Sequence, residues 1–166
     1  MSETPLSRPA FYQYFRDRHD LMETLLGVVK ERIRAEANPW LTGEDEPEAL
    51  RESLRGVVAV GVELGAVLRA VSEAAPFDQR LQRSWRRFLS YWDDAVTTRI
   101  GAQQATGKID CFDAGAIAKA LNALDVAVLV QAFGRKPHAD PEAVLDTLHR
   151  IWVGAIYARL GPACQS

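Results

Sequence analysis

Residues that hold metals are scarce in this chain of 166 residues. Its two cysteines, Cys111 and Cys164, form no CxxC pair, and its three histidines are scattered along the sequence. None of them has a partner at a convincing ligand spacing, so no metal site is expected. The cysteines are expected to be free thiols, with a disulfide as the alternative, because nothing in the sequence indicates secretion.

Catalytic motifs are missing as well. The sequence has no glycine-rich phosphate loop, no HExxH segment and no nucleophile elbow. The adjacent acids Asp93 and Asp94 would point apart on a helix, so they cannot act as a carboxylate pair. We therefore expect neither an enzyme nor a cofactor.

Segments that would send the chain to a membrane or out of the cell are also absent. No apolar run approaches the ~18 residues of a membrane span, and residues 1–5 lack the blocks of a signal peptide. A cytoplasmic protein is expected. The net charge of −2 means that any contact with DNA has to come from a local basic patch.

Helical periodicity is what the chain does have. Hydrophobic residues make up 48% and charged residues 25%, which is the balance of a globular domain with a real core. Apolar stripes and breaking residues predict an all-α fold of five long or medium helices and one or two short ones. We expect helices over 7–15, from Asp17 to about 37 with Asn38-Pro39 as its end, over 47–75 and 79–105, from Asp110 or Asp113 to 133, and from 141 to about 160.

The most distinctive segment is Ser7-Arg8-Pro9-Ala10-Phe11-Tyr12-Gln13-Tyr14-Phe15. Ser7 suits a helix N-cap, and a proline in the first turn costs no hydrogen bond. The two phenylalanines share a face that needs cover, while Arg8 and Tyr12 share another that faces outward. Such a helix can present hydroxyl and guanidinium groups to DNA, although an ordinary N-terminal helix would have the same composition.

This order of residues, followed by Arg16-Asp17-Arg18 and the apolar repeat from Leu21, resembles the third and fourth helices of TetR-family transcriptional regulators. The resemblance implies a homodimer with an N-terminal helix-turn-helix that binds an operator and a helical C-terminal domain that binds a small molecule. It places the DNA contacts on these residues: Ser7, Arg8, Ala10, Tyr12, Tyr14 and Arg18. It also divides the chain into a helix-turn-helix remnant over 1–20 and a ligand-binding and dimerisation domain over 21–166.

Only six residues precede Ser7, whereas the TetR family has two further helices before its recognition helix. Either the chain comes from a truncated or mis-started gene product, or it is a natural regulator that lacks DNA binding. Because the preceding helix positions a recognition helix, little sequence-specific binding is expected from these 166 residues. The alternative function is a helical dimer that binds a small apolar ligand and has no role at DNA.

A stripe of aromatic residues in the predicted helix over 79–105 is the second distinctive feature. Trp85, Phe88, Leu89 and Trp92 follow the i, i+3, i+4, i+7 pattern of one helix face. Core packing would account for the stripe, but aromatic walls with few polar groups also line ligand sites. Asn122 and Asp125, which share one face of an otherwise apolar helix, are candidates for the few polar groups of such a ligand site.

Four further segments extend the resemblance to one ligand-responsive subgroup of TetR repressors: Trp85-Arg86-Arg87-Phe88-Leu89-Ser90-Tyr91-Trp92, Ala120-Leu121-Asn122, Leu145-Asp146-Thr147-Leu148 and Ile151-Trp152-Val153. It implies an apolar tunnel in which Asn122 hydrogen-bonds the ligand and Asp125 replaces a second asparagine. The implied tunnel residues are Val60, Leu64, Trp85, Phe88, Leu89, Trp92, Asn122, Asp125, Val126, Leu129, Phe133 and Trp152. A carboxylate in such a tunnel would select ligands with an amine or another hydrogen-bond donor. The alternative is a structural partner within the protein, such as an arginine of the adjacent long helix.

Small residues interrupt the last two long helices. They are Ala114, Gly115, Ala118, Gly154, Ala155 and Ala158. Small residues let helices approach closely, either within one subunit or between two. The TetR resemblance implies a two-fold interface here, so a symmetric homodimer is expected.

Overall fold

The computed structural model describes residues 8–43 and 47–158, with side chains from residue 19 onward. This part of the chain contains five α-helices and one short 3-10 helix, and no strand. The helices are α1 (Arg8–Thr42), α2 (Pro47–Ala74), η1 (Ala75–Phe77), α3 (Gln79–Ala105), α4 (Ala114–Phe133) and α5 (Pro141–Ile156). The predicted all-α fold is confirmed.

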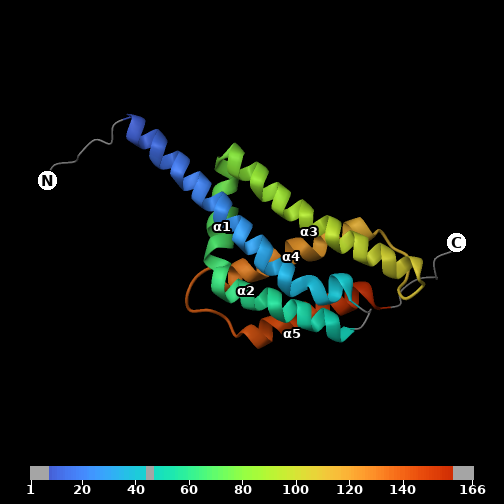
Figure 1. The fold of residues 1–166 in the computed structure, drawn as a ribbon. Helices are drawn as coiled ribbons and strands as arrows, with labels where there is room; N and C mark the ends of the chain where they lie inside the picture. Colours follow the sequence, from blue (N-terminus) through green and yellow to red (C-terminus); the bar gives the residue numbers. More distant parts are fainter. Residues whose placement is uncertain (1–7, 44–46, 159–166) are drawn as a thin grey trace.

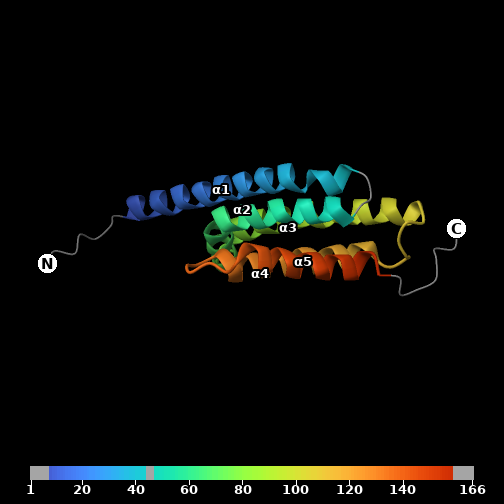
Figure 2. The ribbon, with the colours of Figure 1, turned by 90° about the horizontal axis from the view of Figure 1, so that it is seen from below.

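The helices are stacked in tiers (Figures 1 and 2). In Figure 2, α1 lies on one side, α4 and α5 lie on the opposite side, and α2 and α3 lie between them. The central helix α2 contacts each of the other four long helices. The N-terminal half of α1 projects beyond the bundle in Figure 1, so the segment that resembles a recognition helix stands away from the core.

Two glycines let α2 lie close to α4. A Cβ atom added to Gly61 would lie 2.7 Å from Cδ2 of Leu129, and one added to Gly65 would lie 2.9 Å from the backbone of Phe133. Atoms this close cannot coexist without movement, and at Gly65 the obstacle includes rigid backbone. The absence of a side chain at these two positions therefore allows the close spacing between α2 and α4.

Helix α1 corrects two predicted boundaries. The expected interruption near Asp17 is wrong, because α1 runs without a break from Arg8 to Thr42. Residues 16–19 include neither glycine nor proline, so nothing in the backbone opposes continuation of the helix. The recognition-like segment is thus the first part of α1 and no separate helix.

The predicted end at Asn38-Pro39 is also wrong, since Pro39 lies inside α1. Proline has no N–H for the helix ladder, and a break normally follows. Here Ser53 of α2 repairs it, because its hydroxyl accepts a hydrogen bond from Trp40 N at 3.0 Å and donates to Ala37 O at 3.2 Å. Ser53 of the next helix thus bonds one backbone group on each side of Pro39, and α1 continues for three more residues.

Aspartate side chains cap the starts of α3, α4 and α5. The Asp78 side chain accepts from the N–H groups of Arg80 and Leu81 at the start of α3, and Asp140 caps α5. Of the two candidates before α4, Asp113 is the cap. Gly107 ends the α3 region with a φ of +69°, a left-handed conformation that glycine adopts without strain.

Helix α4 contradicts one expectation. By length and composition it is apolar enough to span a membrane, with a mean hydropathy of 1.5 over its 18-residue window. The expectation that no segment approaches a span is therefore wrong for α4. Yet it packs against α2, α3 and α5 and carries the buried acid Asp125, as a core helix does.

The expectation of a free thiol at Cys111 is wrong as well. Cys111 is disulfide-bonded, whereas Cys164 lies outside the described residues. The sequence contains no other cysteine.

Candidate functional site

A cavity lies in the middle of the bundle. Its volume is about 70 Å³, measured as the space open to the centre of a water molecule. At ~10–15 Å³ of such space per water, it has room for about five water molecules. All five long helices line it: Ile33, Ala37, Trp40 and Leu41 from α1; Leu50, Ser53, Leu54, Val57 and Leu68 from α2; Phe88, Leu89, Trp92 and Val96 from α3; Asn122, Asp125, Val126 and Leu129 from α4; and Trp152 from α5.

Aromatic rings form much of the wall. Trp40 and Trp152 meet edge to face with ring centroids 5.6 Å apart, and Phe88 and Trp92 do so at 6.3 Å. These are favourable aromatic geometries and hold the rings in defined orientations. Within residues 8–43 and 47–158, no lysine, arginine or histidine lines the cavity.

Asp125 is the most unusual residue of the lining. Its Oδ1 accepts a hydrogen bond from Trp152 Nε1 at 2.9 Å, which is its only hydrogen bond within the part of the chain that the structure describes. Burial raises the pKa of Asp125 to about 7, and the Trp152 hydrogen bond opposes this rise only in part. Asp125 therefore has a structural partner, as the alternative expected, and this partner is the indole of Trp152 on α5 and not an arginine of the adjacent helix. The selection of amine ligands by Asp125 stays a prediction.

Asn122 lies one turn before Asp125 and is oriented by a second acid. Its Nδ2 donates a hydrogen bond to Asp93 Oδ1 of α3 at 2.9 Å. Among the described residues no donor is bonded to the amide oxygen of Asn122. Asn122 therefore offers the cavity an acceptor.

A polar network closes one end of the tryptophan wall. The hydroxyl of Tyr157 accepts hydrogen bonds from Trp40 Nε1 at 2.9 Å and from Gln103 Nε2 at 3.0 Å. By contrast, Nε1 of Trp92 is buried and has no hydrogen-bond partner in the part of the chain that the structure describes. An unpaired buried donor costs stability unless something binds to it.

The structure brings most of the predicted tunnel residues together. Those that line the cavity are Phe88, Leu89, Trp92, Asn122, Asp125, Val126, Leu129 and Trp152. The other four, Val60, Leu64, Trp85 and Phe133, do not line it. Binding of a ligand by the first group stays a prediction.

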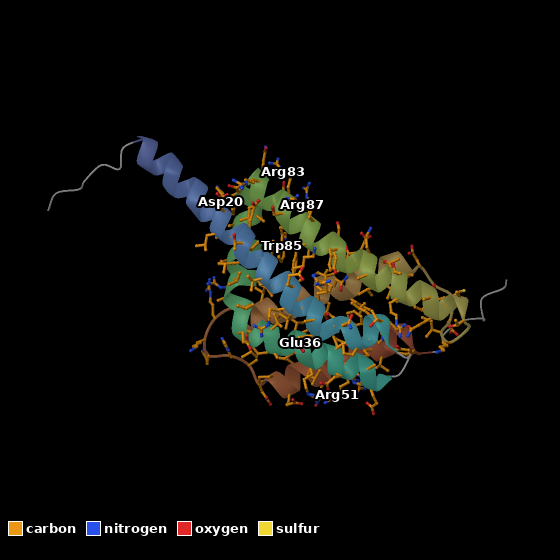
Figure 3. The ribbon with its side chains drawn as sticks, in the orientation of Figure 1. Asp20, Glu36, Arg51, Arg83, Trp85 and Arg87 are labelled. Carbon is orange, nitrogen blue, oxygen red and sulfur yellow. The ribbon has the colours of Figure 1, made fainter. Side chains whose placement is uncertain are left out.

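The four outlying residues have other places in the bundle. Trp85 stacks on Phe88 with the ring planes 11° apart, and Figure 3 shows it near Arg83 and Arg87 at the end from which α1 projects. Val60 and Phe133 are each 1% exposed and belong to the core beside the cavity. Leu64 is half-buried and packs on that core.

Trp40 is the main lining residue that the sequence did not indicate. It follows Pro39, where the helix was expected to end, so it was not placed on any apolar face. Its exposure of only 2% depends on Ser53, which lets α1 continue past the proline. The lining residues of α2 are easier to find from the sequence, since Leu50, Leu54 and Leu68 recur at helical spacing within the helix expected over 47–75.

The predicted DNA-contacting residues are not tested by this geometry. Arg8, Ala10, Tyr12, Tyr14 and Arg18 fall on the projecting turns of α1, where only the backbone is described. Ser7 lies outside the described residues. Their role at DNA stays a prediction.

Comparisons with known proteins match this chain to regulators of transcription. The family model described as the C-terminal domain of the transcriptional regulator EthR matches residues 50–158. The HTH-type transcriptional regulator EthR of Mycobacterium tuberculosis (strain H37Rv) is 30% identical over 161 residues, which cover 92% of this chain and 73% of the relative. EthR of Mycolicibacterium smegmatis is 27% identical over 162 residues, covering 93% and 73%. The matched family domain includes α3, α4 and α5 and nearly all of α2.

Replacing Asp125 with Asn is expected to remove a pH dependence of folding stability. The pKa of Asp125 is about 7 in the folded protein against an ordinary value of 3.8, so the folded state retains a proton that the unfolded chain releases. Stability should therefore fall as the pH rises through this range, by roughly 2–3 kcal/mol between pH 5 and 8. Urea unfolding at both pH values measures the effect.

Asp94→Asn, at an exposed acid of α3, is the matched control and should keep the pH dependence of the wild type. If wild type and Asp125→Asn lose stability in parallel between the two pH values, the buried carboxyl is not its source.

Proposed function

Because this chain belongs to the EthR family of transcriptional regulators within the TetR class, we propose that it is a repressor controlled by a small molecule bound in the cavity. The family is one of regulators, so the chain is not an enzyme. The observation that carries the proposal is the cavity itself, which residues of all five long helices line, mostly with apolar side chains and with two polar groups on α4. Such a combination is typical of small-molecule sites.

Helix α1 provides a route from the cavity to DNA. It contributes Ile33, Ala37 and Trp40 to the cavity wall and extends as one helix to the segment that resembles a recognition helix. A ligand larger than the present space has to displace part of the wall. A displacement of α1 would move its projecting end, which in a dimer changes the spacing of the two DNA-binding segments.

The outer faces of α4 and α5 support a homodimer. Only 28% of the most apolar window of α4 is buried, and its exposed positions include Ala120, Ala123 and Ala127. On α5, Ile151 is 39% exposed and Gly154 is also exposed. An apolar face made of small residues suits close packing against its own copy about a two-fold axis.

The small residues expected at this interface divide between inside and outside. Ala118 is fully buried within the subunit, so its small side chain serves packing within the bundle. Gly154 and Ala158 are exposed and remain candidates for the interface. Cytoplasmic location also belongs to this proposal, because an operator is reached there.

Filling the cavity is expected to weaken binding of a small apolar probe. Val126 lines the cavity, whereas Val130, one turn further along α4, does not, and both are half-buried. Val126→Phe should weaken binding of the neutral dye N-phenyl-1-naphthylamine by at least about tenfold, which corresponds to ~1.4 kcal/mol. Dye fluorescence measures the affinity.

Val130→Phe adds the same volume outside the cavity and should leave the affinity near the wild-type value. An equal loss in both variants, or no loss in either, would show that the dye binds elsewhere.

A charge on the apolar face of α4 is expected to separate the dimer. Ala123→Glu would place a carboxylate opposite its own copy in a desolvated interface, which opposes association. Size-exclusion chromatography with light scattering should find a dimer for the wild type and a monomer for the variant at micromolar concentrations. Ala59→Glu, at an exposed alanine of α2, should remain dimeric. A wild type that is monomeric throughout would overturn the dimer.

A polypeptide of these 166 residues is expected to bind DNA with little sequence specificity. The recognition-like segment continues α1 as a straight helix, whereas a DNA-reading helix is aimed by a helix that crosses the backbone before it. Selection from random duplexes followed by gel shift should enrich no inverted repeat, and Arg8→Ala should behave like the wild type. Enrichment of a repeat bound with nanomolar affinity would refute this expectation.

The second candidate function is a dimeric ligand carrier with no role at DNA. The same cavity and the same apolar face favour it. An enriched operator that is released on ligand binding would exclude the carrier.

A further inference from the structure

The polar groups of the cavity are mainly acceptors. Asp125 and Asn122 lie three residues apart on α4 and both line the cavity. Each has one atom engaged elsewhere: Oδ1 of Asp125 by Trp152, and Nδ2 of Asn122 by Asp93. What remains for a ligand is a carboxyl oxygen and an amide oxygen, and both suit a hydrogen-bond donor.

The rest of the wall suits a positive charge. Phe88, Trp92 and Trp152 line the same cavity as Asp125, and the faces of aromatic rings attract cations. Among the described residues, no lysine, arginine or histidine belongs to the lining, so none of these side chains neutralises Asp125 there. The adjacent Asp93, bonded to Asn122, adds a second acid behind the wall.

The nearby cation Arg99 is engaged at the edge of the cavity. Its guanidinium lies 5.9 Å from the centre of the Trp40 ring, and Nη2 donates to Gly43 O at 2.8 Å. It therefore occupies one side of Trp40 and forms no ion pair with Asp125. The aromatic faces of α3 and α5 are not involved in this contact.

An unpaired carboxyl in this position is costly. Burial opposes its charge, which is why its pKa is raised to about 7, and a buried charge is tolerated when it is paired and hydrogen-bonded. A ligand cation would supply the pairing that the wall lacks. The one unpaired donor of the lining, Trp92 Nε1, would in addition accommodate an acceptor atom on the ligand.

We propose that the cavity selects an apolar amine, with its ammonium group bonded to Asp125 and Asn122 and its hydrocarbon part against the aromatic wall. This inference rests on the proposed function, because it assigns a chemical class to the ligand of the same cavity.

The experiment compares hexylamine, which is an ammonium ion at neutral pH, with its neutral isostere hexan-1-ol. Isothermal titration calorimetry measures both affinities for the whole 166-residue protein. The wild type should bind the amine at least about tenfold more tightly than the alcohol, the equivalent of one charge-assisted contact. In Asp125→Asn this preference should fall to about threefold or less, while the alcohol still binds.

Asp94→Asn is the matched control, because it removes an exposed acid of α3 outside the cavity, and it should keep the preference. Asparagine retains an acceptor for Trp152, so Asp125→Asn is expected to fold, and circular dichroism checks this. The wild-type ratio tests the amine preference without any variant.

Each remaining outcome points to a different failure. Equal affinities in the wild type would overturn the amine preference and leave the cavity as a binding site. A preference that survives in Asp125→Asn would overturn the role of Asp125. Binding of neither probe, together with no binding of the neutral dye, would overturn both the inference and the proposed function.

Discussion

The hydrogen bond from Trp152 to Asp125 is the interaction around which the interior of the bundle is arranged. It ties α5 to α4 at 2.9 Å and holds the Trp152 ring edge to face with Trp40 of α1. Trp40 is in turn bonded to Tyr157, which also holds Gln103 of α3. Four helices are thus linked through one chain of contacts. Because aromatic rings are rigid, they hold open a space that flexible aliphatic side chains would fill.

The same helices serve the cavity and the outer surface of the molecule. One face of α4 carries Asn122 and Asp125 into the bundle, and its opposite face leaves a row of alanines uncovered. Helix α1 likewise joins the Trp40 end of the cavity to the projecting recognition-like turns. A change of volume inside has few places to be absorbed, because Gly61 and Gly65 already hold α2 close to α4. Helix α1 also bounds this cavity, through Ile33, Ala37, Trp40 and Leu41.

The sequence predicts a helix end correctly where that end depends only on neighbouring residues. Asp113, one of the two residues expected to begin the helix that ends at Phe133, caps α4, since an aspartate bonds N–H groups two or three residues ahead of it. The predicted helix end at Pro39 is wrong, because the hydroxyl of Ser53 on another helix bonds the backbone beside the proline. For the same reason the sequence does not indicate Trp40 as a cavity residue. Trp85 was predicted to line the cavity because it shares the stripe of Phe88 and Trp92, but it lies nearer the start of α3 and does not reach the cavity.

By itself the sequence determined the helical class, most helix boundaries, the pairing of Asn122 and Asp125 on one face, and the family resemblance. Each depends on spacing along the chain, which a periodic helix converts directly into geometry. Only the tertiary structure decided that Asp125 is hydrogen-bonded to an indole and not to a guanidinium group. It also decided that Ser53 bonds the backbone beside Pro39, where α1 continues, and that Trp40 lines the cavity. Periodicity shows which side chains share a face, whereas contacts between distant segments decide which faces meet.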